Sequence, residues 1–470
     1  MKKTVVIAGA SGFIGKHLSQ ALMDTHEVVG LSRSRASRPA EPGRIAWRRC
    51  DVLALDDVVR GLEGADVAVY LVHAMMPSSP LVHGGFEDID WMAADNFARA
   101  AAQAGVSHIV YLGGLVPEER TLSPHLSSRL EVERVLGSHG VPVTSLRAGL
   151  VIGPWGSSTT IMLNLVRRLP LMICPAWTET LTQPVALSDV IALLQFAIEH
   201  PDIAGDSYDI GCPEVLTYRR LMEIASEMLG LERRMWSVPL FTPELSRLWV
   251  SMITGAPREL VEPLIQSLTC PMVARDRRIH EMAGVPGVPV ANAIIRALDA
   301  EAIAPTIRPS AFRGHTSRQS QGCVVARLTL PKGRDAQWVA FEYLRRLPEL
   351  TAGPIEVFNF NPHEIRFHVR GLASPLLVLS HDTEASNRER AVFRVQGGRL
   401  IRKGSGGTME FRVVEEIGGP GVLATLYGEQ PGVWWPFYVA FQQLLHVSVL
   451  DHFERHLEGQ TVNPRRHLAA

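Results

Sequence analysis

Three glycines near the start of the chain have the spacing of a phosphate-binding turn. Gly9, Gly12 and Gly15 follow an apolar run and precede residues with helical periodicity. Such a turn needs small residues because the backbone must bend sharply, approach a pyrophosphate closely and direct helix N-terminal amides toward it. The alternative is a turn that only packs a helix on a strand. The pattern favours a dinucleotide site, and its contacts are assigned to Gly9, Ser11, Gly12, Phe13, Ile14 and Gly15.

The residue after the second expected strand bears on which dinucleotide binds. Arg33 follows Ser32 there, with no Asp or Glu at or just after Ser32. A carboxylate would accept a hydrogen bond from a ribose 2′-hydroxyl, whereas a guanidinium can bind a 2′-phosphate with charge-assisted bonds. We therefore expect NADP(H) to be preferred, with NAD(H) as the other possibility. The alternative is that Arg33 belongs to a solvated basic loop with Arg35 and Arg38.

Residues at two further strand ends complete the expected cofactor contacts. Asp51 and Val52 close the third strand, where they would meet the adenine. Leu71 and Val72 end the fourth strand, and His73 follows them near the place expected for the nicotinamide. His73 is thus a candidate proton donor.

Other tyrosine and histidine residues could also donate a proton or bind a metal. Tyr111 lies in a fifth strand, where strand alternation favours a buried core position over a proton donor. A metal site from His73, His83 and His125 is disfavoured because their spacing matches no ligand pattern, so no metal is predicted.

The order of apolar patterns predicts which elements carry these residues. β-Branched runs alternate with helical stretches, which is typical of a doubly wound parallel sheet of the Rossmann type in the α/β class. Strands are expected over residues 4–8, 27–32, 65–72, 107–112 and 141–147, and helices over 13–23, 95–105, 187–200 and 216–230. From about residue 153 to 302 the periodicity is mainly helical, which indicates a substrate lobe.

A second domain is expected after a change in composition. Residues 303–322 are rich in Pro, Ser, Gly and Arg and read as a linker that ends the first domain, 1–302. Residues 323–460 then show period-two patterns, as in Glu364–Gly371, which predict a curved antiparallel sheet with a helix near 335–347 and a long terminal helix over about 434–458. This α+β domain is followed by a tail, 461–470.

Composition excludes some classes of partner. The 470 residues carry a formal net charge of −1 and are 46% hydrophobic, so no global field would draw the chain onto nucleic acid or an anionic membrane. Five scattered cysteines argue against a disulfide framework and favour the cytoplasm. Residues 431–450 lack charge over nearly the length of a membrane span, but their central Gln and His residues favour a buried helix, so no transmembrane segment is expected.

With these residues in view, the chain from residue 1 to about 300 resembles the extended and atypical branch of the short-chain dehydrogenase/reductase superfamily, which includes NAD(P)-binding epimerase-like and NmrA-like proteins. The resemblance is carried by "GASGFIG" and three later stretches, "VTSLRAGLVIGP", "TQPVALSDV" and "YDIGCPEVLTYRRLMEI". The C-terminal domain resembles the START or polyketide-cyclase-like helix-grip fold in architecture only.

The resemblance implies a Ser/Tyr/Lys site, from which this chain departs at all three positions. Gly113 or Gly114 stands at the serine position, His125 replaces tyrosine and Arg129 replaces lysine. His125 could supply a proton, although a nearby guanidinium would lower its pKa, and Arg129 could still bind ribose hydroxyls. His125, Arg129 and His73 are therefore the candidate catalytic residues. The alternative for this stretch is a surface helix in which Arg129 pairs with Glu133.

Two functions follow from this reading. The first is an NADP(H)-dependent oxidoreductase or isomerase that acts on a small, largely apolar carbonyl or olefinic compound, with altered catalytic residues. The second is a non-catalytic regulator or assembly factor that senses NAD(P)(H) and acts on a protein partner through its C-terminal domain. The lack of the Ser/Tyr/Lys residues favours the regulator, and the complete substrate lobe expected from the sequence favours the oxidoreductase or isomerase.

Overall fold

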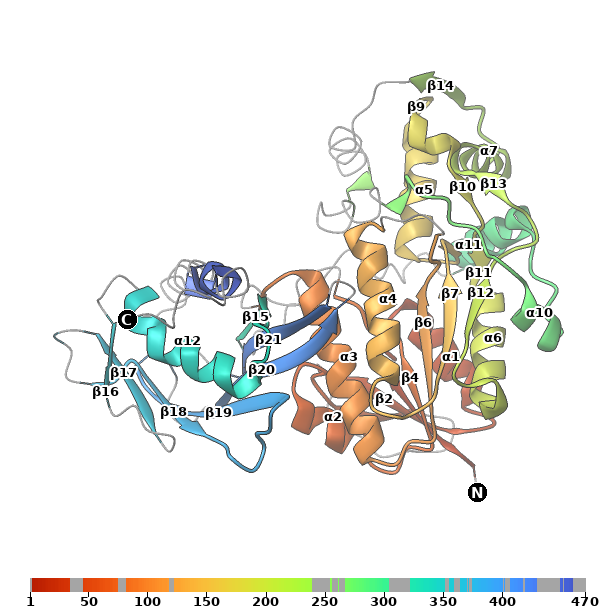
Figure 1. Cartoon of the computed structure of the whole chain (residues 1–470). Coiled ribbons are helices and arrows are strands. Elements are labelled where there is room, and N and C mark those ends of the chain that lie inside the picture. Colours follow the sequence, from red (N-terminus) through yellow and green to blue (C-terminus); the bar gives the residue numbers. More distant parts are fainter. Residues whose placement is uncertain are drawn as a thin grey trace. The chain divides into compact units, whose positions relative to one another are not determined.

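The chain forms two compact units in the computed structural model. The structure describes residues 2–33, 45–74, 82–117, 122–238, 254–255, 261, 267–303, 322–350, 355–358, 364–369, 371, 374–399, 401, 406–416, 419–428, 449–450 and 452–459. Unit 1 consists of residues 1–76 and 90–314, and unit 2 of residues 77–89 and 315–470 (Figure 1). The first domain expected from the sequence, residues 1–302, includes residues 77–89, whereas the structure groups these residues with unit 2.

Unit 1 is built on a seven-stranded parallel sheet in the order β12-β7-β6-β4-β1-β2-β3. Its strands are β1 (Thr4–Ala8), β2 (Glu27–Ser32), β3 (Ala46–Arg49), β4 (Val67–Tyr70), β6 (His108–Gly114), β7 (Val143–Ala148) and β12 (Ser207–Ile210). The order reverses between β1 and β4, and ligands of such sheets bind beyond the carboxyl ends at that switch point. The predicted Rossmann-type sheet is confirmed.

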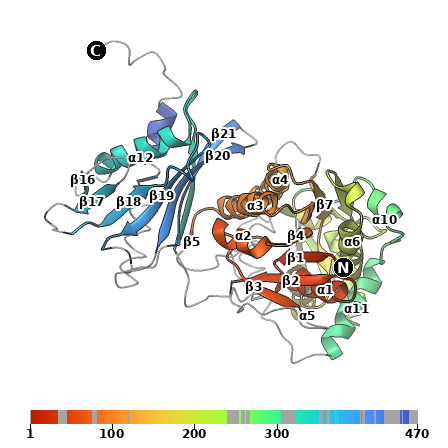
Figure 2. The same ribbon diagram turned by 90° about the horizontal axis from the view of Figure 1, so that it is seen from below.

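Helices cover both faces of this sheet (Figure 2). Those of unit 1 are α1 (Phe13–Leu22), α2 (Leu55–Leu62), α3 (Phe86–Gln103, of which 86–89 fall in unit 2), α4 (Pro124–Gly137), α5 (Ser157–Arg168), α6 (Leu187–Glu199), α7 (Tyr218–Met228), α10 (Arg278–Met282) and α11 (Val290–Ile303). One layer of the core joins buried strand residues such as Val5 and Val69 to Leu18 of α1 and Leu194 of α6. The alternation of β-branched strands and amphipathic helices therefore folds as expected.

The region expected to form a substrate lobe gathers α5, α7 and α11 around a separate core that includes Leu163, Leu221 and Ile294. Short strands join these helices in two-stranded pairs. They are β8 (Val151–Ile152), β9 (Leu171–Pro175), β10 (Leu181–Thr182), β11 (Val185–Ala186), β13 (Leu216–Thr217) and β14 (Arg234–Val238).

Unit 2 is an eight-stranded sheet in the order β16-β17-β18-β19-β20-β21-β15-β5, antiparallel except for the parallel pair of β15 and β5. Its elements are β5 (Val82–His83), β15 (Cys323–Thr329), α12 (Ala336–Leu350), β16 (Ile355–Phe358), β17 (Ile365–Val369), β18 (Leu377–His381), β19 (Arg390–Gly397), β20 (Gly407–Glu416) and β21 (Gly419–Tyr427). The predicted α+β class with an antiparallel sheet is confirmed.

Aromatic side chains fill the core between this sheet and its helices. Tyr343 of α12 lies 5.5 Å from the ring of Phe411 and 5.2 Å from that of Phe453, in the helical residues 452–459. Most of the expected long helix 434–458 lies outside the described residues, and so does most of the expected linker. The helix-grip resemblance of this domain stays a prediction. Within the part of the chain that is described, no helix is both long and apolar enough to cross a membrane.

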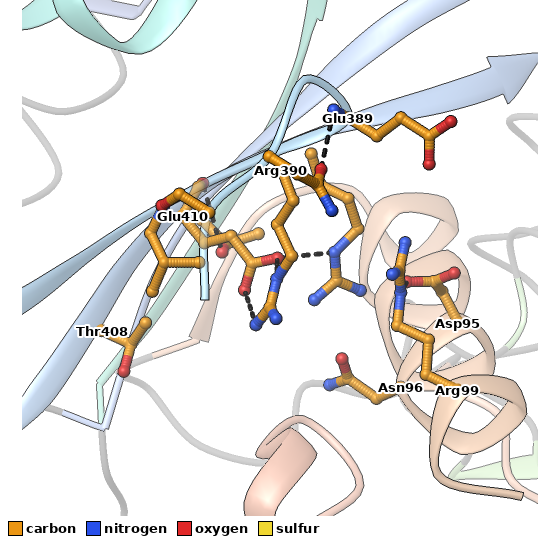
Figure 3. A network of polar contacts seen from close by, with 12 residues as sticks. Asp95, Asn96, Arg99, Glu389, Arg390, Thr408 and Glu410 are labelled. Carbon is orange, nitrogen blue, oxygen red and sulfur yellow. Dashed lines mark hydrogen bonds and ion pairs between the residues drawn. The ribbon is translucent and has the colours of Figure 1, made fainter. Parts of the chain in front are cut away.

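A charged cluster lies on the strands β19 and β20 (Figure 3). Arg390 donates two hydrogen bonds to Glu410, at 2.5 and 3.1 Å, and Arg412 donates another at 2.7 Å. Burial alone would raise the pKa of the Glu410 carboxyl, but the two guanidinium groups lower it to about 2. Glu410 is therefore a charged, paired residue that joins two strands.

Candidate functional site

The turn after β1 has the shape that a phosphate-binding turn requires. Gly9 adopts φ +89°, a conformation that favours glycine, and a Cβ there would lie 2.9 Å from the Leu71 carbonyl oxygen. A Cβ at Gly15 would lie 2.2 Å from the Gly9 carbonyl oxygen. Glycine is thus required at both positions to bring α1 close to β1 and β4.

Gly12 has a different role because it is exposed at the start of α1. It is the N-cap of α1, no side chain caps this helix, and a Cβ at Gly12 would approach only the Gly9 carbonyl oxygen, at 3.1 Å. Ser11, Phe13 and Ile14 are half-buried in the same turn. The first amides of α1, which follow this exposed glycine and have no side-chain cap, fit a dinucleotide pyrophosphate.

The expected adenosine contacts lie side by side at the ends of β2 and β3. Ser32 pairs with Arg49, and the Cys50 amide donates to the Ser32 carbonyl at 3.1 Å, so Arg33 and Asp51 follow neighbouring strands. Ser32 is buried and Arg33 is exposed. The exposed guanidinium can therefore reach a phosphate at this edge.

The segment that carries Asp51 and Val52 is held by hydrogen bonds. The Asp51 carboxylate accepts from the Leu53 amide at 3.1 Å, and Asn96 of α3 donates to the Val52 and Leu53 carbonyls at 3.1 and 3.0 Å. Asn96 was not predicted from the sequence. It fixes the backbone on which the expected adenine contacts depend.

The residues after β4 border the same turn. The Leu71 amide donates to the Ala8 carbonyl at 3.0 Å, and both Leu71 and Val72 are half-buried. His73 is exposed. The amide of the next residue, Ala74, donates to the Asp90 carboxylate at 2.6 Å. This bond fixes the backbone beside His73.

His125 and Arg129 lie on helix α4, which connects β6, the strand next to β4, to β7. Its N-cap Ser123 accepts a hydrogen bond from the Leu126 amide at 3.3 Å, and Pro124 begins the helix. His125 is half-buried, and Arg129, one turn later, is only 8% exposed. The surface-helix alternative is therefore wrong for Arg129, because it is buried and Glu133 instead binds Arg147 at 2.6 and 2.9 Å.

Arg129 is a buried cation with polar neighbours. Burial alone would lower its pKa, but Tyr111 and Asp90 raise it. The Tyr111 hydroxyl donates to the Arg129 carbonyl oxygen at 3.4 Å, and burial raises the pKa of Tyr111 to about 12. Tyr111 is fully buried, as strand alternation predicted, so it is a core residue.

Both candidate histidines are neutral at physiological pH. Burial and the Arg129 cation lower the pKa of His125 to about 3. Desolvation, Arg129 and His125 lower the pKa of His73 to about 3, although solvent reaches this exposed residue and screens the charges there. A neutral imidazole is a poor proton donor but can still donate an N–H hydrogen bond to a developing oxyanion.

The lowered pKa of His125 predicts how the stability of the fold depends on pH. Between pH 6.5, the ordinary histidine pKa, and about 3, the unfolded chain binds a proton at position 125 that the folded chain does not, so acid destabilises the fold. The loss at pH 5 amounts to at most about 2 kcal/mol from His125. We expect His125→Gln to have a flatter Tm against pH between 7 and 5 than the wild type, measured by calorimetry. Equal slopes for the two proteins would contradict the shift.

The structure distinguishes the two glycines at the expected serine position. A Cβ at Gly113 would lie 2.8 Å from the Tyr111 ring, whereas one at Gly114 has ordinary contacts, the nearest being Arg129 Cγ at 3.6 Å. A serine could therefore be accommodated only at position 114 of these two.

Asp90, which no sequence pattern predicted as a site residue, contacts both the segment after β4 and helix α4. It is 2% exposed, binds the Ala74 amide and accepts from Ser128 Oγ at 3.5 Å. No local pattern distinguishes Asp90 among the acidic residues of α3. In the described part of the chain, no group of three or more His, Cys, Asp or Glu residues could hold a metal ion.

Comparisons with known proteins agree with this geometry. A family model described as NAD(P)H-binding matches residues 9–151. Auxiliary protein GraX of Staphylococcus aureus is 30% identical over 143 residues, which are 30% of this chain and 43% of that protein. Ceramide reductase of Caulobacter vibrioides is 24% identical over 253 residues, which are 50% of this chain and 73% of that protein.

The fold has a counterpart among solved structures. A nucleoside-diphosphate-sugar epimerase from Staphylococcus aureus has a TM-score of 0.51 at 18% identity and covers 63% of this chain and 100% of its own. Residues 9–151 therefore match an NAD(P)H-binding family, and the chain shares the fold of that epimerase structure over 63% of its length, in agreement with the resemblance to atypical short-chain dehydrogenase/reductase proteins.

Proposed function

We propose that this chain is an NADP(H)-dependent reductase of a small, largely apolar carbonyl or olefinic compound. The observation that carries the proposal is the position of His73, His125 and the buried Arg129 at the carboxyl edge of the sheet, beside the turn for the pyrophosphate. Bound NADPH would supply a hydride to the acceptor. The chain's own residues would hold the cofactor and stabilise the oxygen on which negative charge develops.

The protonation states favour a particular class of acceptor. Burial and the Arg129 cation hold the pKa of His125 near 3, and desolvation and Arg129 also lower the pKa of the exposed His73, so at neutral pH both imidazoles are uncharged and are poor acids. A simple ketone would give a strongly basic alkoxide and would need a proton donor, which typically contributes about 100- to 10,000-fold. A conjugated carbonyl or enone instead gives a delocalised oxyanion. The Arg129 charge and imidazole N–H groups can stabilise that anion until solvent protonates it.

The residues that would hold the cofactor follow from the strand ends. The amides of α1 would bind the pyrophosphate, Asp51 and Val52 would meet the adenine, and Arg33 would bind the 2′-phosphate. Leu71 and Val72 would line the nicotinamide side.

Arg33→Ala should separate the two dinucleotides. We expect the Kd for NADPH to rise about 10- to 100-fold, because the guanidinium binds a doubly charged phosphate, and the Kd for NADH to change by less than about threefold. Fluorescence titration of both nucleotides would measure this. Lys16→Ala, on the outward side of α1, is the matched loss of an exposed cation and should affect neither nucleotide. An equal effect of Arg33→Ala on both nucleotides would refute the assignment.

The names of two relatives support different candidates. The name ceramide reductase fits a reductase of an apolar compound, whereas the name auxiliary protein fits a non-catalytic role. The lowered pKa of both candidate histidines also favours that second candidate, a regulator that senses NAD(P)(H) and acts on a protein partner through unit 2.

One experiment separates the two functions. The purified chain would be analysed by mass spectrometry for bound nucleotide and then assayed with NADPH against matched acceptors, a quinone or enone and a saturated ketone. The reductase predicts oxidation of NADPH with the conjugated acceptors and little with the ketone. If the chain binds NADPH but reduces no acceptor, the reductase is excluded and the sensing regulator is supported. If it binds neither NADPH nor NADH, both proposed functions are overturned.

A further inference from the structure

We infer that Asp90 is a positioning residue for the candidate site, and this inference rests on the proposed reductase function. Asp90 is 2% exposed in α3, where a lone carboxylate would be costly unless its hydrogen bonds served the fold or the site. Its position on α3 lies between the segment after β4 and helix α4. It therefore touches both segments that carry the candidate catalytic residues.

The first contact fixes the segment after β4. The Ala74 amide donates to Asp90 Oδ1 at 2.6 Å, a short charge-assisted bond to a backbone group. Ala74 directly follows His73, so this bond restricts the φ and ψ angles that set the direction of the imidazole. At its other end the segment is held by the Leu71 amide, which donates to the Ala8 carbonyl. His73 is thus held between two backbone bonds.

The second contact fixes helix α4. Ser128 Oγ lies 3.5 Å from Asp90 Oδ2, and Ser128 directly precedes Arg129. The carboxylate also attracts the buried Arg129 cation electrostatically. One carboxylate therefore aligns the imidazole of His73 with the helix that bears His125 and Arg129. Displacing a reacting group by about 1 Å can reduce turnover about 100-fold.

Two substitutions separate the effect of the hydrogen bond to the Ala74 amide from the effect of the negative charge of Asp90. Asp90→Asn retains an oxygen that can accept from Ala74 and loses the charge, whereas Asp90→Ala loses both contacts. For Asp90→Ala we expect kcat/KM with NADPH and a conjugated acceptor to fall about 100-fold, mainly in kcat, while the Kd for NADPH changes by less than about threefold. Amide hydrogen exchange at Ala74 should become at least tenfold faster. Asp90→Asn should retain slow exchange and lose less activity.

Asp95 provides a matched control on the same helix (Figure 3). It is equally buried, at 2% exposed, but it pairs with Arg99 at 2.8 Å and His139 at 2.7 Å. Asp95→Ala should lower Tm, but amide exchange at Ala74 and kcat should both stay at the wild-type values. If Asp90→Ala fails to fold, Asp90→Ser, whose side chain is too short to reach Ala74, replaces it.

The possible results lead to distinct conclusions. If Asp90→Ala leaves exchange at Ala74 unchanged and its kcat matches that of Asp95→Ala, the positioning role is overturned. If the wild type reduces no acceptor, the proposed function fails. Exchange at Ala74 still decides in that case whether Asp90 holds the segment beside His73, because that measurement does not depend on turnover.

Discussion

Gly12→Val is expected to raise the Kd for NADPH at least 100-fold, equivalent to about 2.7 kcal/mol, while Tm stays within a few degrees of the wild type. Gly12 has extended backbone angles that valine adopts readily, and a Cβ there makes one tight contact, 3.1 Å from the Gly9 carbonyl oxygen, which a shift of a few tenths of an ångström relieves. The added methyl groups would instead occupy the space in which the pyrophosphate approaches the amides of α1. Titration with NADPH together with calorimetry would measure both quantities.

Gly15→Ala is the matched comparison for this variant. Its Cβ would lie 2.2 Å from the Gly9 carbonyl oxygen and 2.7 Å from Ala10 Cα, so α1 would have to move away from β1. We expect this variant to lose stability as well as NADPH affinity. Retained NADPH affinity in Gly12→Val would show that the dinucleotide does not bind at the start of α1. Both proposed functions would then fail.

The triple variant Gly114→Ser, His125→Tyr and Arg129→Lys is expected to raise turnover of simple ketones by NADPH about 100- to 10,000-fold, the usual contribution of one acid–base group. A tyrosine near a lysine ammonium has a lowered pKa and can donate the proton that the neutral imidazoles cannot. Position 114 has ordinary van der Waals space for the serine. Steady-state kinetics with a saturated ketone would test the prediction.

The control for the triple variant places the serine at position 113. Ser at this position would meet the Tyr111 ring, where a Cβ already lies at 2.8 Å, so Gly113→Ser in the same background should gain no activity and should lower Tm. If the variant with Ser at position 114 binds NADPH but reduces no ketone, there is no productive substrate position. The sensor function would then be favoured over the reductase.

Local features of the dinucleotide site could be predicted from the sequence. The strands Thr4–Ala8 and Glu27–Ser32 have the bounds expected from their apolar runs, and Gly9, Gly12 and Gly15 lie in the expected turn. These features depend on backbone freedom and on contacts between residues close in sequence. The match of this chain to an NAD(P)H-binding family model, residues 9–151, covers the same region.

The sequence by itself determined the glycine turn between Thr4–Ala8 and the first helix, in which we propose that a dinucleotide's phosphates bind, because glycine spacing and strand periodicity act over a few residues. Only the tertiary structure decided that Arg129 is buried, that Asp90 joins two distant segments and that burial adds to the effect of Arg129 on the pKa of His125. The physical reason is that desolvation and electrostatic attraction depend on which side chains meet in space. In this chain the side chains concerned come from α3, α4 and the segment after β4, whose order in the sequence gives no information on their contacts.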